Sequence, residues 1–209
     1  MTAATPPADV PASDVPPAGG RDEAATDRRQ LLQLIRDRAI VHGRVTLSSG
    51  READHYVDLR RITLDGTAAP LVGRVLLDLV ADLRADPGFA AVGGLTLGAD
   101  PVAAAMVHAA AAVPGGVLDA FVVRKEEKAH GLQRRIEGPN VTGRRVLAVE
   151  DTSTTGGSVL TAVAALRAAG ATVVAVAVIV DRGTGAEQAV RDAGLEYRAA
   201  YSAADLGLT

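Results

Sequence analysis

Cysteine and tryptophan are absent from this chain, and aromatic residues are scarce. Without cysteine the chain can form no disulfide, no thiolate nucleophile and no cysteine-ligated metal site. Aromatic residues make up 2% of its 209 residues, so a core must be built from alanine, valine, leucine and isoleucine. The longest apolar run, residues 171–180, is too short to span a bilayer, and the start lacks the pattern of a signal peptide. We therefore expect a soluble, cytoplasmic protein.

The chain also lacks a strong excess of either charge, because 22 basic and 25 acidic residues leave a formal net charge of -3. That balance argues against a general binder of nucleic acid or of membrane surfaces, so neither is expected as a partner. Lysine is nearly absent as well. Lys125 and Lys128 are the only lysines in the sequence, and they lie in one four-residue window, which points to a functional role.

The first 25 residues differ in composition from the rest of the chain. They are rich in proline, alanine and aspartate, and five of the ten prolines precede position 18. Such a segment cannot bury enough apolar surface to order itself, so residues 1–25 are predicted to be a disordered tail. Residues 26–209 are of a suitable length for one domain with its own core.

Within 26–209, apolar runs of strand length alternate with segments of helical periodicity. The pattern predicts an α/β fold with a mostly parallel sheet flanked by helices. Helices are expected over 27–40, 66–84, 100–112, 157–169 and 184–193, and strands over 44–47, 56–59, 90–92, 118–123, 145–149, 172–180 and 197–201. Asp100 is expected to cap the helix that follows it.

The most informative segment follows the predicted strand at 145–149. The apolar run ends in two adjacent carboxylates, after which small hydroxyl and glycine residues precede a helix. Backbone N–H groups beside glycine, together with a helix N-terminus, form a favourable cradle for a phosphate group. The candidate binding residues are Glu150, Asp151, Thr152, Ser153, Thr154, Thr155, Gly156, Gly157 and Ser158. The alternative is a plain turn with a solvated acid pair and a helix cap.

Glu150 and Asp151 require a separate explanation, because carboxylates would repel a phosphate directly. They fit a ligand that carries hydroxyl groups next to its phosphate, as a ribose phosphate does. They would then accept hydrogen bonds from the ribose hydroxyls, or help to hold a hydrated Mg²⁺ ion. Phosphate cradle and acid pair together favour the transfer of a sugar phosphate.

Two further segments carry positive charge at the expected ligand edge of the sheet. Residues 124–138 contain Arg124, Lys125, Lys128 and His130, and such a loop can close over a diphosphate and exclude water. The alternative is a solvated loop of mixed charge. Arg182 follows the strand at 172–180, and a guanidinium there suits a carboxylate ligand. Its alternative is an ordinary surface arginine at a helix entry.

Five stretches of the chain together resemble a known family. They are Leu47–Arg51, Tyr56–Asp58, Arg124–Gly131, Val146–Ser158 and Val180–Arg182. In this order they resemble the type I phosphoribosyltransferases and, among these, the orotate phosphoribosyltransferases, over residues 28–209. The resemblance implies a type I phosphoribosyltransferase fold with a small N-terminal hood. It also implies transfer of phosphoribose from 5-phosphoribosyl 1-diphosphate to orotate, a Mg²⁺ cofactor, and a homodimer with shared active sites.

The resemblance also implies roles for individual residues. Residues 150–158 would hold the phosphoribosyl donor, and Arg124, Lys125, Lys128 and His130 its diphosphate. Thr154 and Arg182 would contact orotate. The catalytic residues would be Lys128, His130 and Asp151, and Mg²⁺ would be bound mainly through the diphosphate and ribose rather than by direct protein ligands.

Two segments depart from the family pattern, at position 48 and at positions 97–98. The family often carries lysines where this chain has Ser48 and Gly98, and a tyrosine where it has Leu97. Other readings therefore stay open at this point. One is a type I phosphoribosyltransferase for a purine or another base, although a neutral purine offers Arg182 no carboxylate. Another is a non-catalytic nucleotide-sensing regulator, for which the expected basic RNA-binding face is missing.

Overall fold

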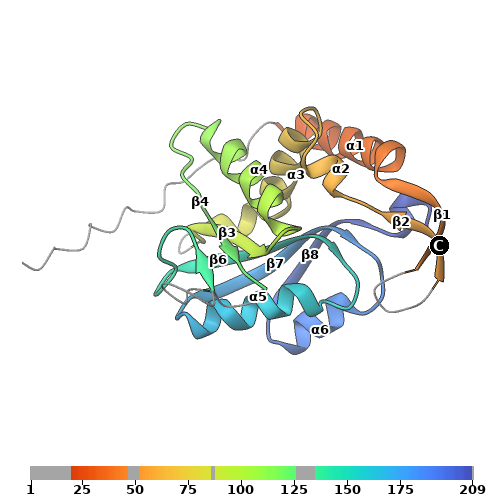
Figure 1. Ribbon diagram of the computed structural model, residues 1–209. Helices are drawn as coiled ribbons and strands as arrows, with labels where there is room; N and C mark the ends of the chain where they lie inside the picture. Colours follow the sequence, from red (N-terminus) through yellow and green to blue (C-terminus); the bar gives the residue numbers. More distant parts are fainter. Residues whose placement is uncertain (1–19, 47–51, 86–87, 126–134, 209) are drawn as a thin grey trace, which may run out of the picture.

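The computed structural model describes residues 20–46, 52–85, 88–125 and 135–208. Its centre is a six-stranded sheet in the order β5-β4-β3-β6-β7-β8 (Figure 1). The five long strands run parallel and β5 is antiparallel to β4. The strands are β3 (Ala91–Leu95), β4 (Asp119–Val123), β5 (Ile136–Glu137), β6 (Arg145–Ser153), β7 (Thr172–Asp181) and β8 (Glu196–Ser202). The mostly parallel sheet expected from the sequence is confirmed.

Helices cover both faces of this sheet. In Figure 1, α1 (Arg21–Arg38), α3 (Ala69–Leu79) and α4 (Ala99–Ala111) lie above it, and α5 (Gly157–Ala168) and α6 (Ala186–Asp192) lie below. The buried apolar side chains accordingly form two clusters, one on each face. Because β6 and β7 are covered on both faces, their central residues are all apolar rather than alternating with polar ones.

The small N-terminal hood consists of an antiparallel hairpin and a short helix. The hairpin strands are β1 (Ile40–Thr46) and β2 (Glu52–Val57), and α2 (Arg60–Thr63) follows them. The Asp58 backbone N–H donates to the Ala39 carbonyl oxygen at 2.9 Å, which ties the start of α2 to the end of α1. Figure 1 shows the hairpin at one end of the molecule, next to the C-terminus.

The strand order fixes where a ligand can bind. From β3 the chain passes to β4 on one side, and later returns to place β6 on the other side of β3. The connections after β3 and after β6 therefore leave the sheet in opposite directions. A crevice opens at such a switch point, beyond the carboxyl ends of the two strands. The segment 150–158 lies at that point.

Several element boundaries differ from those expected. The first helix begins at Arg21 rather than Asp27, so residues 21–25, assigned to the disordered tail, are helical. The helix expected over 66–84 is α3, which ends at Leu79 and is followed by a 3₁₀ turn, Ala81–Arg84. The sequence predicted neither α2 nor β5, because segments of four and two residues are too short for a periodic pattern. None of the described helices is long and apolar enough to cross a bilayer.

Candidate active site

Strand β6 carries the acid pair into the switch point. The strand extends through Ser153, so Glu150 and Asp151 lie within the last four residues of the strand. The sequence had placed them in the loop beyond it. The chain then turns at Thr154–Gly156 and enters α5. Gly156 has φ 80°, a left-handed conformation that favours glycine, so this residue type is required by the turn.

The cradle at the start of α5 is open to solvent. Thr154, Thr155, Gly157 and Ser158 are exposed, and no side chain caps the helix N-terminus. The first-turn N–H groups are therefore available to an anion, with the helix dipole in its favour. Ser153 differs from its neighbours, because it is only 1% exposed. Its side chain is therefore withdrawn from solvent, whereas those of Thr154 and Thr155 are exposed.

Burial shifts the protonation of both acids. It raises the pKa of Glu150 to about 7, with a further rise from the charge of Asp151, and the nearby hydroxyls of Ser158 and Ser153 oppose the shift. Burial also raises the pKa of Asp151, against a hydrogen bond from the Thr152 backbone N–H to Asp151 Oδ1 at 2.7 Å. Among the described residues neither acid forms an ion pair. Both are thus largely buried carboxylates with no cationic partner in the described part of the chain.

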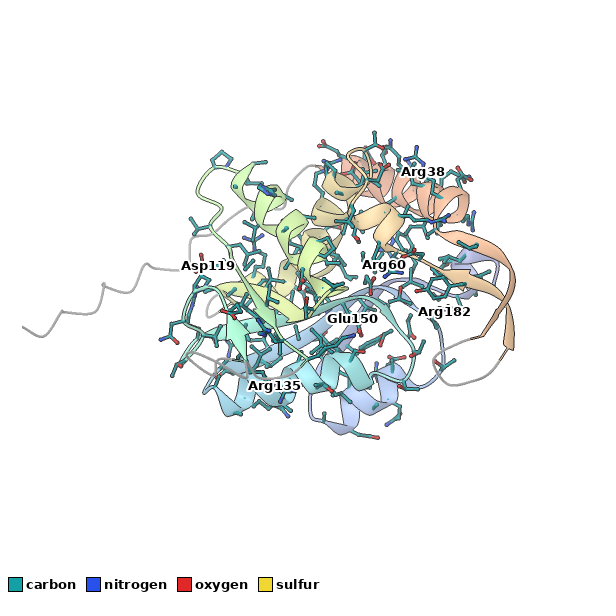
Figure 2. The ribbon with its side chains drawn as sticks, in the orientation of Figure 1. Arg38, Arg60, Asp119, Arg135, Glu150 and Arg182 are labelled. Carbon is teal, nitrogen blue, oxygen red and sulfur yellow. The ribbon has the colours of Figure 1, made fainter. Side chains whose placement is uncertain are left out.

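The hood contributes a charged pair that the sequence analysis missed. Arg60 Nε donates to Asp58 Oδ1 at 2.7 Å, and this bond holds the pKa of Asp58 below its usual value. The positive charge of Arg60 also acts on Asp151, whose pKa it lowers. Figure 2 shows Arg60 above Glu150, with Arg182 to its right. No motif points to Arg60, since only the fold brings α2 over the end of β6.

Arg182 lies directly beside the cradle. Its backbone N–H donates to the Ser153 carbonyl oxygen at 2.9 Å, which extends the β6–β7 pairing by one residue. The following turn is held by Asp181, whose Oδ1 accepts the Gly183 N–H at 2.9 Å. The structure therefore brings Arg182, the acid pair and the cradle to one edge of the sheet, as the sequence predicted.

The loop after β3 lies close to Asp151 at the same switch point. A side chain at position 98 would place its Cβ 2.7 Å from Asp151 Oδ1, so only glycine fits there without displacing the acid. The lysine that the family often has at this position would require a different arrangement of Asp151. Asp100 does not cap α4 as expected, because the helix begins at Ala99; its Oδ2 accepts the Thr96 hydroxyl at 2.6 Å instead.

The basic segment is described only at its two ends. Arg124 follows β4, and its guanidinium Nη1 lies 3.6 Å from Glu137 Oε1. The backbone N–H of Arg124 donates to the Arg135 carbonyl oxygen at 2.8 Å. Lys125 is exposed. Both lie at the same sheet edge as Asp151, with β3 between β4 and β6. Lys128 and His130 lie outside the described residues, as does the 47–51 turn of the family pattern.

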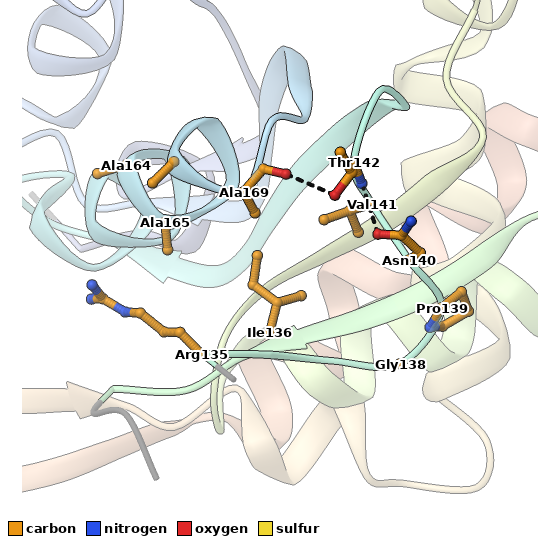
Figure 3. Close-up of a pocket in the computed structure, with 11 residues that line it drawn as sticks. Arg135, Ile136, Gly138, Pro139, Asn140, Val141, Thr142, Ala164, Ala165 and Ala169 are labelled. Atoms are coloured by element: carbon orange, nitrogen blue, oxygen red, sulfur yellow. Dashed lines mark hydrogen bonds between the residues drawn. The ribbon is translucent and has the colours of Figure 1, made fainter. Parts of the chain in front are cut away.

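A cavity of about 770 Å³ lies away from the acid pair and the cradle, at the opposite end of α5. Figure 3 shows Arg135 and Ile136 on one side of it and alanines of α5 on the other. Thr142 closes one end, where its hydroxyl donates to the Ala169 carbonyl oxygen at 3.0 Å. The crevice at the sheet edge, rather than this cavity, holds the acids and the cradle.

Comparisons with known proteins agree with this geometry. A family model for the phosphoribosyl transferase domain matches residues 90–193. The orotate phosphoribosyltransferase of Streptomyces coelicolor is 70% identical over 182 residues, which cover 87% of this chain and 97% of that protein. The one from Mycobacterium tuberculosis is 59% identical over 185 residues, covering 88% and 99%.

A solved structure is also similar in three dimensions. The crystal structure of Mycobacterium tuberculosis H37Rv orotate phosphoribosyltransferase in complex with 5-phospho-alpha-D-ribosyl 1-diphosphate superposes with a TM-score of 0.74. It is 54% identical to this chain, and the match covers 87% of this chain and 99% of that one. The similarity therefore extends over both the hood and the sheet.

Proposed function

This chain belongs to the orotate phosphoribosyltransferase family, and from that premise we propose how its residues divide the work of the reaction. The enzyme transfers a 5-phosphoribosyl group from 5-phosphoribosyl 1-diphosphate to orotate, giving orotidine 5′-phosphate and diphosphate in pyrimidine biosynthesis. It is a pentosyltransferase. The observation that carries the assignment of roles is the pair of buried, unpaired acids at the end of β6, directly before an uncapped helix N-terminus.

The donor would occupy the β6–α5 edge. Exposed N–H and hydroxyl groups at 154–158 would bind its 5-phosphate, where the α5 dipole favours negative charge. Glu150 and Asp151 would accept hydrogen bonds from the ribose hydroxyls. Those hydroxyls would replace the water that the two acids lose on burial, and hydrogen bonds to a charged acceptor are the stronger kind. The ribose of the donor would thus supply hydrogen-bond donors to the two carboxylates.

Orotate would lie beside Arg182. The guanidinium can hold the orotate carboxylate with two parallel hydrogen bonds, and Thr154 can add a hydroxyl contact. The backbone hydrogen bond between Arg182 and Ser153 fixes Arg182 next to the last residue of β6. A base without a carboxylate could not form these two hydrogen bonds, which is how the site would select orotate over a purine.

Catalysis would depend on charge at the bond that breaks. As diphosphate leaves, the ribose carbon becomes cation-like, and Asp151 is placed to stabilise it. Arg124, Lys125, Lys128 and His130 would stabilise the departing diphosphate, following the family motif. Arg60 is a further cation near Asp151. With serine at 48 and glycine at 98, the donor would rely more on the 124–130 segment.

Magnesium fits this arrangement when it arrives with the donor. Among the described residues no group of three or more His, Cys, Asp or Glu side chains could hold a metal ion. The oxygen-rich crevice nevertheless suits Mg²⁺, which binds phosphate oxygens and keeps several waters. We propose that the diphosphate and ribose of the donor, rather than direct protein ligands, would mainly hold Mg²⁺, which would supply charge neutralisation for the leaving group.

Three further properties remain proposals from family membership and sequence. The enzyme would work as a homodimer in which part of the basic loop serves the partner's site. It would act in the cytoplasm. Residues 26–209 would form a single phosphoribosyltransferase domain; of the tail predicted over residues 1–25, positions 1–19 lie outside the described residues and α1 starts at Arg21.

An orotate assay tests these assignments. Purified protein, Mg²⁺, the diphosphate donor and orotate are mixed, and the loss of orotate absorbance is followed. We expect turnover with orotate and none with purine bases; the reverse would refute the assignment. Arg182→Gln should raise KM for orotate about tenfold while KM for the donor is unchanged. Arg191→Gln, at an exposed arginine paired with Glu187 on α6, is the matched control and should leave both values unchanged.

A further inference from the structure

Two buried hydroxyl groups beneath the cradle have no hydrogen-bond partner. They are Ser153 Oγ and Tyr197 OH, in residues that are 1% and 8% exposed. An unpaired buried hydroxyl costs about 1–3 kcal/mol, so folded proteins rarely keep one without a use for it. The free protein therefore bears an energetic cost at this place that packing alone does not explain.

Both hydroxyls lie along a line that joins the acid pair to the Arg182 turn. Ser153 is opposite Asp181 in the β6–β7 register. Tyr197, on β8, has its hydroxyl near the Ser153 hydroxyl and the Asp181 carboxylate, although neither contact has the geometry of a formed hydrogen bond. Burial raises the pKa of Tyr197 most, Asp181 raises it further, and Ser153 lowers it. Ser153 in turn acts on Glu150. The order of polar groups is thus Glu150, Ser153, Tyr197 and Asp181.

We propose that Ser153 and Tyr197 are positioning residues, which together fix the Glu150 carboxylate for the ribose of the bound donor. This inference rests on the proposed function. Tyr197 OH would donate to Ser153 Oγ, and the Ser153 hydroxyl would donate to Glu150. Hydrogen bonds at active sites are often open in the free protein and tighten when the ligand binds, which fits the unpaired state observed here.

Other polar groups around Glu150 leave room for this role. Asp151, directly adjacent, repels its charge, and Ser158 approaches it from the first turn of α5. The Asp181 carboxylate is already used at Oδ1 by the Gly183 N–H. The Tyr197 phenol keeps its proton at neutral pH, as tyrosine ordinarily does, and can act as the donor at the start of the chain.

Tyr201 provides an internal contrast on the same strand. It is 3% exposed, and its hydroxyl donates to the Arg28 carbonyl oxygen at 2.7 Å. The Arg28 guanidinium lies 5.2 Å from the centre of its ring. This tyrosine joins β8 to α1, on the face away from the cradle, and its hydroxyl is fully used in the free protein. Its role is therefore structural.

The two Tyr→Phe variants should consequently have opposite effects. Tyr197→Phe should raise KM for the donor about tenfold, the equivalent of one hydrogen bond, with kcat and KM for orotate changed less than about twofold. Its Tm should be unchanged or slightly higher, because an unpaired buried hydroxyl is removed. Tyr201→Phe should lower Tm by roughly 3 °C, from the loss of about 1 kcal/mol, with every kinetic constant retained.

A double variant tests whether the two hydroxyls act as one chain. Ser153→Ala should raise KM for the donor as Tyr197→Phe does, and the double variant should be no worse than Ser153→Ala alone. Unchanged donor KM in Tyr197→Phe, additive effects, or kinetic losses that follow Tm in both tyrosine variants would overturn the proposal. Calorimetric titration of the donor with Mg²⁺ measures the same differences even if wild-type protein fails to turn over orotate, so the two failures are distinguishable.

Discussion

Carboxylates are withdrawn from solvent both on α1 and at the end of β6, but only the carboxylate on α1 has a cationic partner in the described part of the chain. Asp27 on α1 is 9% exposed and accepts two hydrogen bonds from Arg74 on α3, at 2.6 and 3.0 Å. Glu150 and Asp151 on β6 are also largely buried, but no arginine or lysine among the described residues pairs with them. Burial raises the pKa of both acids.

The difference separates a structural carboxylate from functional ones. At Asp27 the protein supplies the counter-charge itself, and the pair joins two helices. At the end of β6 we propose that the ligand supplies the counter-groups, so the free protein carries two poorly solvated acids. Largely buried acids without a counter-charge cost stability and are typical of sites that bind or react. Replacing an acid at the end of β6 by its amide should therefore change activity, whereas replacing Asp27 by asparagine should change stability.

The largest effect is expected at Asp151. Asp151→Asn keeps the shape of the side chain but removes the charge that stabilises the cation-like ribose, so kcat/KM should fall on the order of 100-fold. The Tm should not fall, because a buried unpaired charge is lost. Steady-state kinetics and a thermal melt on one preparation measure both. Near-normal turnover would remove Asp151 from the catalytic residues.

Asp27→Asn should show the converse. Loss of a charged, doubly hydrogen-bonded partner should lower the free energy of unfolding by about 2 kcal/mol. Turnover by the folded fraction should be unchanged, since the pair joins α1 to α3 far from the cradle. Urea unfolding with kinetics at a temperature well below Tm provides the measurement. Lost turnover with unchanged stability would contradict the contrast.

Glu150 predicts a pH effect of intermediate size. Its pKa is raised from 4.5 to about 7, so between these pH values the folded protein holds a proton that the unfolded chain has released. Its contribution to stability is therefore fully present below about pH 4.5 and is lost as pH rises through about 7. Glu150→Gln removes this loss, and at pH 8 its Tm should exceed wild type by roughly 3 °C, or about 1 kcal/mol. Equal melting curves for the two proteins at pH 5 and pH 8 would count against it.

The smallest effect is expected at Arg60, which is exposed and acts on Asp151 without a direct contact. Arg60→Gln should raise the pKa of Asp151 and reduce kcat/KM about twofold to threefold, mostly at the acid end of the profile. Arg61→Gln, at the neighbouring exposed arginine, is the control and should leave the profile unchanged. Identical profiles for both variants would show that the hood charge plays no part.

Most of the fold and part of the candidate site could be predicted from local sequence. The apolar runs predicted β6 and β7, and the glycines with the acid pair predicted the cradle at the start of α5. These features depend on contiguous residues. The start of α1 was misplaced because residues 21–25 have helix-favouring acids in the first turn but no apolar periodicity.

The missed site residues depend on distant contacts. Arg60 reaches the site because the hood folds over the sheet. Tyr197 reads in the sequence as one apolar residue of a strand, and only the β6-β7-β8 order brings it close to Ser153. Burial of Ser153 could not be read from a stretch of small hydroxyl residues, all of which look equally suited to a phosphate. Tertiary packing decides these cases.

The central claim is that the acid pair is left unpaired in order to hold the donor's ribose. Calorimetric titration of 5-phosphoribosyl 1-diphosphate with Mg²⁺ into wild type, Asp27→Asn and the Glu150→Gln, Asp151→Asn double variant tests it most directly. Wild type and Asp27→Asn should bind alike, whereas the double variant should bind about 100-fold more weakly, from two lost charged hydrogen bonds, while melting no lower than wild type. A double variant that binds the donor as tightly as wild type would contradict the account.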